Sequence, residues 1–343
     1  MKICLLTRRA NLTTGGIGRV TIELQKGLEA LGHEVQIVST DREDLISYFK
    51  YVFRDIKKQI PNNFDIYHAI TPMESLKIPK DKSVATILDI IPITNPNLHG
   101  ARMGSNRIKQ FLGKACFKIG CSSASKCKKV VCISDHVKDE FNDRFSIEES
   151  NISTIRLGIR KDLKLKQKVG RTLRIGYFGQ IDRRKRIHLL VWAFINSKID
   201  GELLLGGGGT DPNYRNYIKN MVKDDSRVKL LGYIPDSELV DFYSQIDTLV
   251  FPTAAEGYGL PIVEAMACKK PVIVLSDAII PKEVKYKCII VDNLEGIFRD
   301  QYFFEELITC YGNVEENYAF AKLHDWDDCI KNYIKVYEKV LSC

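Results

Sequence analysis

The chain alternates short apolar runs with longer stretches in which apolar residues recur three and four positions apart. Apolar runs of strand length predict buried strands, and the helical spacing predicts amphipathic helices. The pattern begins with a predicted strand at residues 2–7, a glycine-rich turn at 13–19, a helix at 20–32 that ends at Gly32, and a second strand at 34–40. This order predicts a βαβ unit, in which two parallel strands are joined by a helix.

Both halves of the chain continue this alternation. In the first half, further strands are predicted at residues 64–70, 83–91, 129–134 and 152–158. After a lysine-rich segment, strands are predicted at 173–181, 201–207, 227–232, 247–253 and 271–276, and helices at 188–197, 213–224, 236–246 and 260–269. Buried strands that alternate with helices predict an α/β fold with two doubly wound parallel sheets. We place the junction near residues 162–170, between an N-terminal domain at 1–165 and a C-terminal domain from 166 to 323.

Length and composition agree with two folded, water-soluble domains. The chain has 343 residues, 45% of them apolar and 27% charged, and a domain takes roughly 150 residues. The first apolar run meets Arg8 and Arg9 too soon for a signal peptide, and no apolar stretch approaches the roughly 18 residues of a membrane span. Ten cysteines without the framework of a short secreted protein favour a reducing compartment. We therefore expect a cytoplasmic protein.

Four cysteines, Cys116, Cys121, Cys127 and Cys132, lie close together in the sequence. A metal or cluster site is one interpretation of this group. The spacing contains no CxxC pair, so free thiols are the favoured interpretation.

The net charge of +8 is concentrated partly between Ile90 and Ser134, where eight Lys or Arg residues occur without an acid. In the tract at 102–129, these cations mix with Phe and Ile side chains at roughly helical spacing. One interpretation is peripheral contact with an anionic membrane surface, on its inner face, that presents a lipid-linked acceptor. The other is an amphipathic helix that covers the first sheet. The tract has no recognised nucleic-acid motif, so we expect no nucleic-acid partner.

The segment EGYGLPIVE at 256–264 follows a predicted strand and opens a predicted helix. Gly257 and Gly259 allow backbone amides to approach an anion, and the N-terminus of the helix that begins near Leu260 favours negative charge. Phosphate would repel the two glutamates, so Glu256 and Glu264 are expected to contact hydroxyl groups on either side of it. This spacing fits a nucleotide sugar. The alternative is that Glu264 is an ordinary first-turn glutamate and Glu256 a solvated loop acid.

The segment EGYGLPIVEAMACKKPVIV resembles the E-x7-E segment of the retaining glycosyltransferases of family 4, which have the GT-B fold. Four further segments resemble this family in the same order: GGIGRVTIELQKGLEALGHEV, VVCISDHVKDEF, YFGQIDRRK and RVKLLGYIPDSELVDFYSQIDTLVFPT. The resemblance implies two Rossmann-like domains that face a central cleft, with a C-terminal helix at 324–343 crossing back to the first domain. It also implies transfer of a sugar from a nucleoside diphosphate sugar to a glycan, lipid-linked or small-molecule acceptor. The configuration at the anomeric carbon would be retained, without a cofactor or a required metal.

The resemblance also implies roles for individual residues of the donor site. Glu256 would contact the donor sugar, Glu264 the ribose, and Lys185 the diphosphate. A fixed cation there would stabilise the charge that the leaving diphosphate gains; the alternative is a lysine on a solvated turn. The remaining expected donor-binding positions are Gly15, Gly16, Gly179, Gln180, Tyr233, Gly257, Tyr258, Gly259 and Leu260.

Two positions depart from the family pattern. Gln180 stands where the family usually has an arginine, and Arg183, Arg184 or Arg186 would have to compensate. Leu88 stands where the family often has a histidine near the reaction centre.

Two residues of the first half are candidates to replace the missing histidine. Asp89 would take over contacts with the donor sugar, and His68 would line the acceptor cleft. A capping or loop acid and a structural histidine are the respective alternatives.

Asp325, Trp326 and Asp327 form a DxD pattern, which in the other major glycosyltransferase fold binds a divalent metal. Here the pattern precedes a predicted helix, so we expect the two aspartates at a helix start and no metal site. The favoured function is a retaining, GT4-like hexosyltransferase. A nucleotide-sugar epimerase of the same fold and a catalytically silent scaffold that binds a nucleotide or a membrane are the alternatives.

Overall fold

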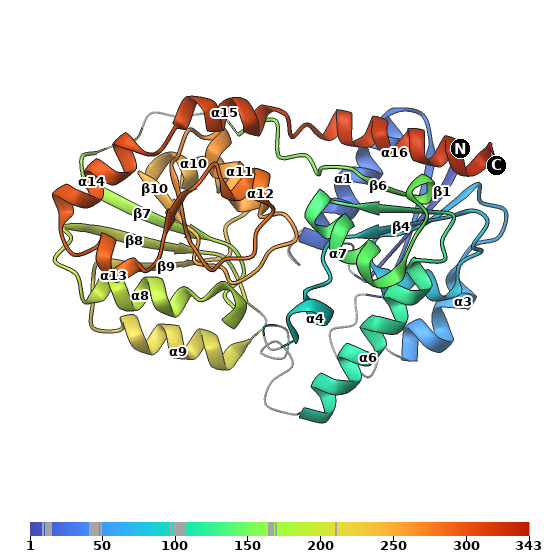
Figure 1. Ribbon diagram of the computed structural model, residues 1–343, viewed down its shortest axis with the longest axis horizontal. Coiled ribbons are helices and arrows are strands. Elements are labelled where there is room, and N and C mark those ends of the chain that lie inside the picture. The colour runs from blue at the N-terminus through green and yellow to red at the C-terminus, as the bar shows by residue number, and fades with distance from the viewer. Residues whose placement is uncertain are drawn as a thin grey trace. The chain divides into compact units, whose positions relative to one another are not determined.

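The computed structural model describes residues 1–8, 10, 16–40, 48, 50–96, 98, 107–163, 168, 170–209 and 211–342, with the side chains of 107–109 excepted. These residues form two compact units (Figure 1). Unit 1 contains Met1–Pro96, Asn106–Gly158 and Asp325–Cys343, and the main segment of unit 2 is Ile159–His324. The chain therefore passes from unit 1 to unit 2 after Gly158, a few residues before the expected junction, and returns after His324.

Unit 1 is built on a parallel sheet of six described strands in the order β2-β1-β3-β4-β5-β6. The strands are β1 (Lys2–Thr7), β2 (Glu34–Ser39), β3 (Ile66–Ala69), β4 (Ser83–Ile87), β5 (Lys129–Cys132) and β6 (Ile152–Thr154). The helical segments are α1 (Gly16–Ala30), η2 (Tyr51–Asp55), α3 (Ile56–Gln59), η3 (Pro72–Lys77), α4 (Ile91–Thr94), α6 (Arg107–Ala124), α7 (Asp135–Phe145), η5 (Glu149–Asn151) and α16 (Trp326–Leu341). The predicted strands are confirmed, and the first helix begins at Gly16, earlier than expected.

Unit 2 has a second parallel sheet, also of six described strands, in the order β12-β11-β10-β7-β8-β9. The strands are β7 (Leu173–Phe178), β8 (Gly201–Gly206), β9 (Val228–Gly232), β10 (Thr248–Val250), β11 (Val272–Leu275) and β12 (Ile289–Val291). The helical segments are η6 (Arg183–Lys185), α8 (Ile187–Ile195), α9 (Pro212–Val222), η7 (Asp236–Glu238), α10 (Leu239–Gln245), α11 (Leu260–Ala267), α12 (Lys282–Lys285), α13 (Leu294–Ile297), α14 (Gln301–Cys310) and α15 (Val314–Lys322). The prediction of two doubly wound parallel sheets is confirmed.

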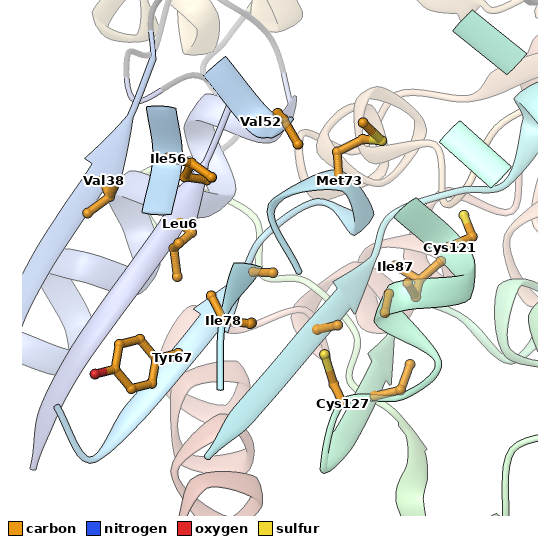
Figure 2. Packing of buried hydrophobic residues seen from close by; sticks show 14 of the residues in the cluster. Leu6, Val38, Val52, Ile56, Tyr67, Met73, Ile78, Ile87, Cys121 and Cys127 are labelled. Carbon is orange, nitrogen blue, oxygen red and sulfur yellow. The ribbon is translucent and has the colours of Figure 1, made fainter. Parts of the chain in front are cut away.

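The core of unit 1 explains most of its cysteines. Cys121 and Cys127 pack in the same apolar cluster as Leu6 and Ile87 (Figure 2). Burial raises the pKa of each of these two thiols, and it raises that of Cys132 to about 12. Cys116 lies partly exposed at the edge of this cluster. These side chains are free thiols, and three of them serve as small core hydrophobes.

The last helix, α16, belongs to unit 1 and packs against α1 and β4. The two helices approach closely at Gly27, where an added Cβ would lie 1.8 Å from the Ile330 side chain. Asp325 accepts a hydrogen bond from the Asp327 amide and so caps the start of α16. The expectation of a helix start at the DxD pattern is confirmed. Among the described residues, no group of His, Cys, Asp or Glu is arranged to hold a metal ion.

Candidate active site

The sheet of unit 2 reverses its winding direction between β7 and β10, which lie side by side. From β7 the chain winds outward to β8 and β9, and then returns to place β10 on the other side of β7. Loops that leave the carboxyl ends of two such strands separate and leave room for a ligand. The segment from Gly179 to Lys185 follows β7, and the segment from Thr253 to Glu256 follows β10. Lys185 and Glu256 therefore meet at the switch point of this sheet.

Glu256 is the centre of a compact group of polar side chains. Its Oε1 atom lies 2.5 Å from Lys185 Nζ, 3.0 Å from an Arg184 guanidinium nitrogen and 2.5 Å from the Thr253 hydroxyl. The side chains of Lys185, Arg184 and Glu256 are 7%, 11% and 10% exposed, so these charges are largely removed from water. Lys185 Nζ also lies 4.7 Å from the centre of the Phe251 ring. Glu256 is therefore not a solvated loop acid, and Lys185 is not a lysine on a solvated turn.

The two cations keep Glu256 ionised. Burial acts to raise the pKa of Glu256, but the charges of Arg184 and Lys185 outweigh it and lower the pKa to about 2. Burial lowers the pKa of Lys185 to about 8, although Glu256 acts in the opposite direction. At neutral pH both groups are charged and form an ion pair.

The arginines of the segment after β7 differ in their contacts. Arg186 is held by the main-chain carbonyls of Pro252 and Thr253 and by two hydrogen bonds to Asp277. Arg183 is 57% exposed, and its Nε lies 3.9 Å from Asp211. Arg184 is the arginine of this group that contacts Glu256.

The helix after the glycines, α11, begins as the sequence predicts. Gly259 precedes it with φ of 93°, a conformation that favours glycine. The amides of Gly259 and Leu260 donate to no group among the described residues, as expected for the start of a helix. These amides and Lys185 are the groups of unit 2 that suit a diphosphate.

Glu264 lies in α11 and is 1% exposed. Its Oε2 accepts a hydrogen bond of 3.0 Å from the Tyr243 hydroxyl, which lies 3.3 Å from the Pro261 carbonyl. Glu264 is thus held by a partner from α10 and is not a solvated helix glutamate.

Two glycines that lie directly after β7 and β8 are in close contact. Gly179 after β7 and Gly207 after β8 have φ of 149° and 127°, and an added Cβ on Gly207 would lie 1.8 Å from the Gly179 carbonyl oxygen. Gln180 lies partly exposed beside Gly179, and its carbonyl accepts a hydrogen bond from Tyr177. Tyr233, just after β9, is 50% exposed.

The side chain of Tyr258 is directed away from solvent. It is 2% exposed, and its hydroxyl is hydrogen-bonded to Nε2 of His324. The Tyr258 ring is buried against the segment that leads back to unit 1, so a donor contact of Tyr258 would have to involve its backbone and stays a prediction.

In unit 1, the expectation that His68 lines an acceptor site is wrong. His68 is fully buried in β3, and its ring nitrogens are 2.8 Å from the Tyr337 hydroxyl and 2.7 Å from the Thr86 hydroxyl. Burial lowers the pKa of His68 to about 3. His68 is a neutral core residue that joins β3 and β4 to α16.

Asp89 and Gly16 lie after the carboxyl ends of β4 and β1, where ligands of such sheets bind. One Asp89 carboxylate oxygen accepts a hydrogen bond of 3.2 Å from the Ile91 amide, two residues further on, so Asp89 has a local role in the loop before α4. Its contact with a donor sugar remains a prediction. Gly16 is the first residue of α1, and Gly15 lies outside the described residues.

Sequence reasoning missed two residues of the site, Thr253 and Tyr243. Thr253 lies three positions before Glu256, where a strand end brings its hydroxyl to the carboxylate. Tyr243 lies in α10 and Glu264 in α11, with β10 between them in the sequence. Their spacing in the chain therefore does not predict their contact.

The two parallel sheets, each with helices around it, define a GT-B fold. Sucrose-phosphate synthase from Thermosynechococcus elongatus has a similar structure, with a TM-score of 0.77 and 17% identity over 99% of each chain. Anabaena HepE, solved in complex with UDP and glucose, has a TM-score of 0.72 and 16% identity over 99% of this chain and all of that one. These likenesses establish the fold.

Sequence comparison relates the chain to glycosyltransferases. Residues 172–297 match the family model described as glycosyl transferases group 1. O-antigen chain mannosyltransferase B of Escherichia coli is 26% identical over 308 residues, which cover 80% of this chain and 74% of that protein. The match relates residues 172–297 to the group 1 glycosyltransferases, and the relatives that match over more of the chain are named as glycosyltransferases as well.

Proposed function

We propose that the protein is a retaining, metal-independent hexosyltransferase that moves a sugar from a nucleoside diphosphate sugar to a glycan, lipid-linked or small-molecule acceptor. The observation that carries the proposal is the ionised Glu256, held by Lys185 near the amides of Gly259 and Leu260, which donate to no group in the described ranges. A carboxylate accepts hydrogen bonds from sugar hydroxyls, and the amides and the ammonium group suit a diphosphate. The family match supports sugar transfer and disfavours the epimerase and silent-scaffold alternatives.

We propose the chemical steps that the resemblance to the family implies. The bond between the anomeric carbon and the phosphate oxygen breaks, and the electron pair leaves with the diphosphate. Lys185 and the amides at the start of α11 stabilise this charge, which is the task that a divalent metal performs in other sites. The acceptor oxygen bonds to the anomeric carbon from the same face, and its proton passes to the departing phosphate oxygen. Glu256 orients the sugar through its hydroxyls, and Glu264 binds the ribose.

We also propose that unit 1 contacts an anionic membrane surface through α6. Phe111, Leu112 and Ile119 of this helix are 70%, 49% and 48% exposed, and Lys118 is exposed among them. Apolar and basic side chains together on one helix bind anionic lipid surfaces. No helix of the described residues is long and apolar enough to cross a bilayer. We place the reaction in the cytoplasm, because the free thiols suit a reducing compartment.

Nucleotide binding without metal tests the donor site. We expect that one of UDP, GDP, ADP and dTDP raises the thermal stability of the wild type in EDTA. At a hundredfold excess over Kd, the gain is about 2.7 kcal/mol. Glu264→Gln, which keeps the side-chain shape, should lose most of this gain, whereas Glu295→Ala on the exposed surface of unit 2 should keep it.

Two outcomes would contradict the proposal. Stabilisation that requires Mg²⁺ or Mn²⁺ would refute metal independence. No stabilisation by any of the four nucleotides would favour the silent scaffold.

A further inference from the structure

Arg184 and Lys185 approach the same atom of Glu256. Both cations and the Thr253 hydroxyl contact Oε1, whereas Oε2 accepts no hydrogen bond from the described residues and is not sealed from solvent. The carboxylate is therefore anchored through one oxygen and presents the other. Such an arrangement suits an acceptor for a sugar hydroxyl, so this inference rests on the proposed function.

The two cations differ in how firmly they are tied to the loop after β10. Lys185 ends in a single ammonium group on a flexible stem. Arg184 has a planar guanidinium that donates to the Ala255 carbonyl and contacts Glu256, and its own main-chain carbonyl accepts a 2.8 Å hydrogen bond from the Ala254 amide. A diphosphate that binds at Lys185 competes directly with Glu256 for the ammonium group. Arg184 can hold Glu256 throughout, because its contacts do not depend on Lys185.

We propose that Arg184 is a positioning residue that keeps Glu256 in place and ionised while Lys185 binds the donor diphosphate. Arg184 then acts through Glu256 on the sugar and is not itself a ligand of the phosphates. Glu256 needs this second cation because the donor diphosphate, with two negative charges, binds the Lys185 ammonium group that otherwise holds Glu256. Neither neighbour can replace Arg184, since Arg186 is bound to Asp277 and Arg183 is directed toward Asp211.

The other charged or titratable groups near this cluster are Asp182 and Tyr177. Asp182 is 1% exposed and accepts a hydrogen bond from the Lys185 amide. Tyr177 is fully buried, and its pKa lies well above its ordinary value because of burial and the nearby acids. Neither group carries positive charge, so loss of Arg184 leaves Lys185 as the one cation of the described part of the chain that contacts Glu256.

The test compares a nucleoside diphosphate with the corresponding glucose conjugate by isothermal titration calorimetry. UDP, GDP, ADP and dTDP are each paired with their glucose conjugate, and the pair that binds the wild type is used with the variants. The preference is the affinity for the sugar nucleotide divided by the affinity for the free diphosphate. In Arg184→Met this ratio should fall roughly tenfold, which corresponds to the loss of one charge-assisted hydrogen bond. This loss should exceed any loss of affinity for the free diphosphate. Arg184→Lys should restore part of the preference, and Arg183→Met should leave it unchanged.

A pH series separates positioning from a general structural effect. In Arg184→Met, the preference should decline further between pH 8 and 5, because Glu256 then takes up a proton more readily. The wild type shares the changes that come from titration of Lys185 and of the terminal phosphate of the free diphosphate, so the expected result is a steeper decline in Arg184→Met than in the wild type.

Two results would overturn the assignment. If Arg184→Met lowers the affinity for the free diphosphate by a larger factor than it lowers the preference for the sugar nucleotide, Arg184 is a phosphate ligand. An unchanged preference in a folded Arg184→Met variant would also refute it. If no pair binds the wild type, the proposed function itself fails, and this assignment fails with it.

Discussion

Replacing Glu256 by glutamine tests the electrostatics of the site without any ligand. The substitution keeps the side-chain shape but removes the charge that faces Lys185 and Arg184. It removes the Glu256 carboxylate from two cations that have little solvent contact. Breaking a buried ion pair in this way is strongly destabilising. We therefore expect Glu256→Gln to unfold more easily than the wild type at neutral pH.

The magnitude follows from the pKa of Glu256. Folding lowers this pKa from 4.5 to about 2, so the folded protein binds fewer protons than the unfolded chain between these values. The stabilisation is fully present above pH 4.5 and is lost as the pH falls through 2. Each pH unit of this interval corresponds to about 1.4 kcal/mol, which gives a contribution of about 3 kcal/mol. At pH 3, about half of this contribution to the free energy of unfolding should be lost.

Urea unfolding at pH 7 and pH 3 measures this difference. The chain has two tryptophans, Trp192 in unit 2 and Trp326 in unit 1. In a Trp326→Phe background, fluorescence reports the unfolding of unit 2. Glu202→Gln is the matched control, because its 2.9 Å ion pair with Arg174 is partly exposed and should contribute less than about 1 kcal/mol.

Two results would refute the reasoning. A Glu256→Gln variant within about 1 kcal/mol of the wild type at pH 7 would show that the ion pair stabilises little. A deficit of the same size at pH 7 and pH 3 would show that ionisation of Glu256 is not its cause.

Two further predictions concern unit 1. The pKa of His68 is lowered on folding from 6.5 to about 3, so wild-type stability should fall by about 2 kcal/mol between pH 6.5 and 5. His68→Phe should lack this slope when Trp326 fluorescence is followed in a Trp192→Phe background, and an equal slope in both proteins would disprove the assignment. For membrane contact, the double variant Phe111→Ser, Ile119→Ser should cosediment at least roughly tenfold more weakly with phosphatidylglycerol vesicles. Tyr286→Ser, at a side chain of unit 2 that is 72% exposed, should bind like the wild type, and unchanged binding of the double variant would contradict the proposal.

The sequence was sufficient for the sheets because buried strands and amphipathic helices have distinct periodicities. It was also sufficient to place Glu256, Gly259 and Glu264 around a helix start, since these residues are close in the chain. Lys185 came from the resemblance, and its contact with Glu256 spans 71 positions.

The contacts that the sequence did not predict share a physical cause. His68 contacts Tyr337, 269 positions away, and only the return of the chain to unit 1 brings them together. Tyr258 points toward His324 for a similar reason. Among Arg183, Arg184 and Arg186, the pattern could not distinguish the arginine of the site, because a short 3-10 turn directs adjacent side chains toward different partners.

The assignment of α16 to unit 1 has a consequence for synthesis of the chain. A ribosome completes the whole of unit 2 before it adds Asp325–Cys343, so unit 1 is the first to begin and the last to be finished. Until then the Gly27 face of α1 lacks Ile330, and His68 lacks Tyr337. Loss of the final helix would therefore damage the unit that holds the N-terminus and leave the Glu256 cluster intact. A chimera that exchanges the nucleotide-binding half with that of a relative has to be built as an internal insertion at Gly158 and Asp325, because an end-to-end fusion would separate α16 from its own sheet.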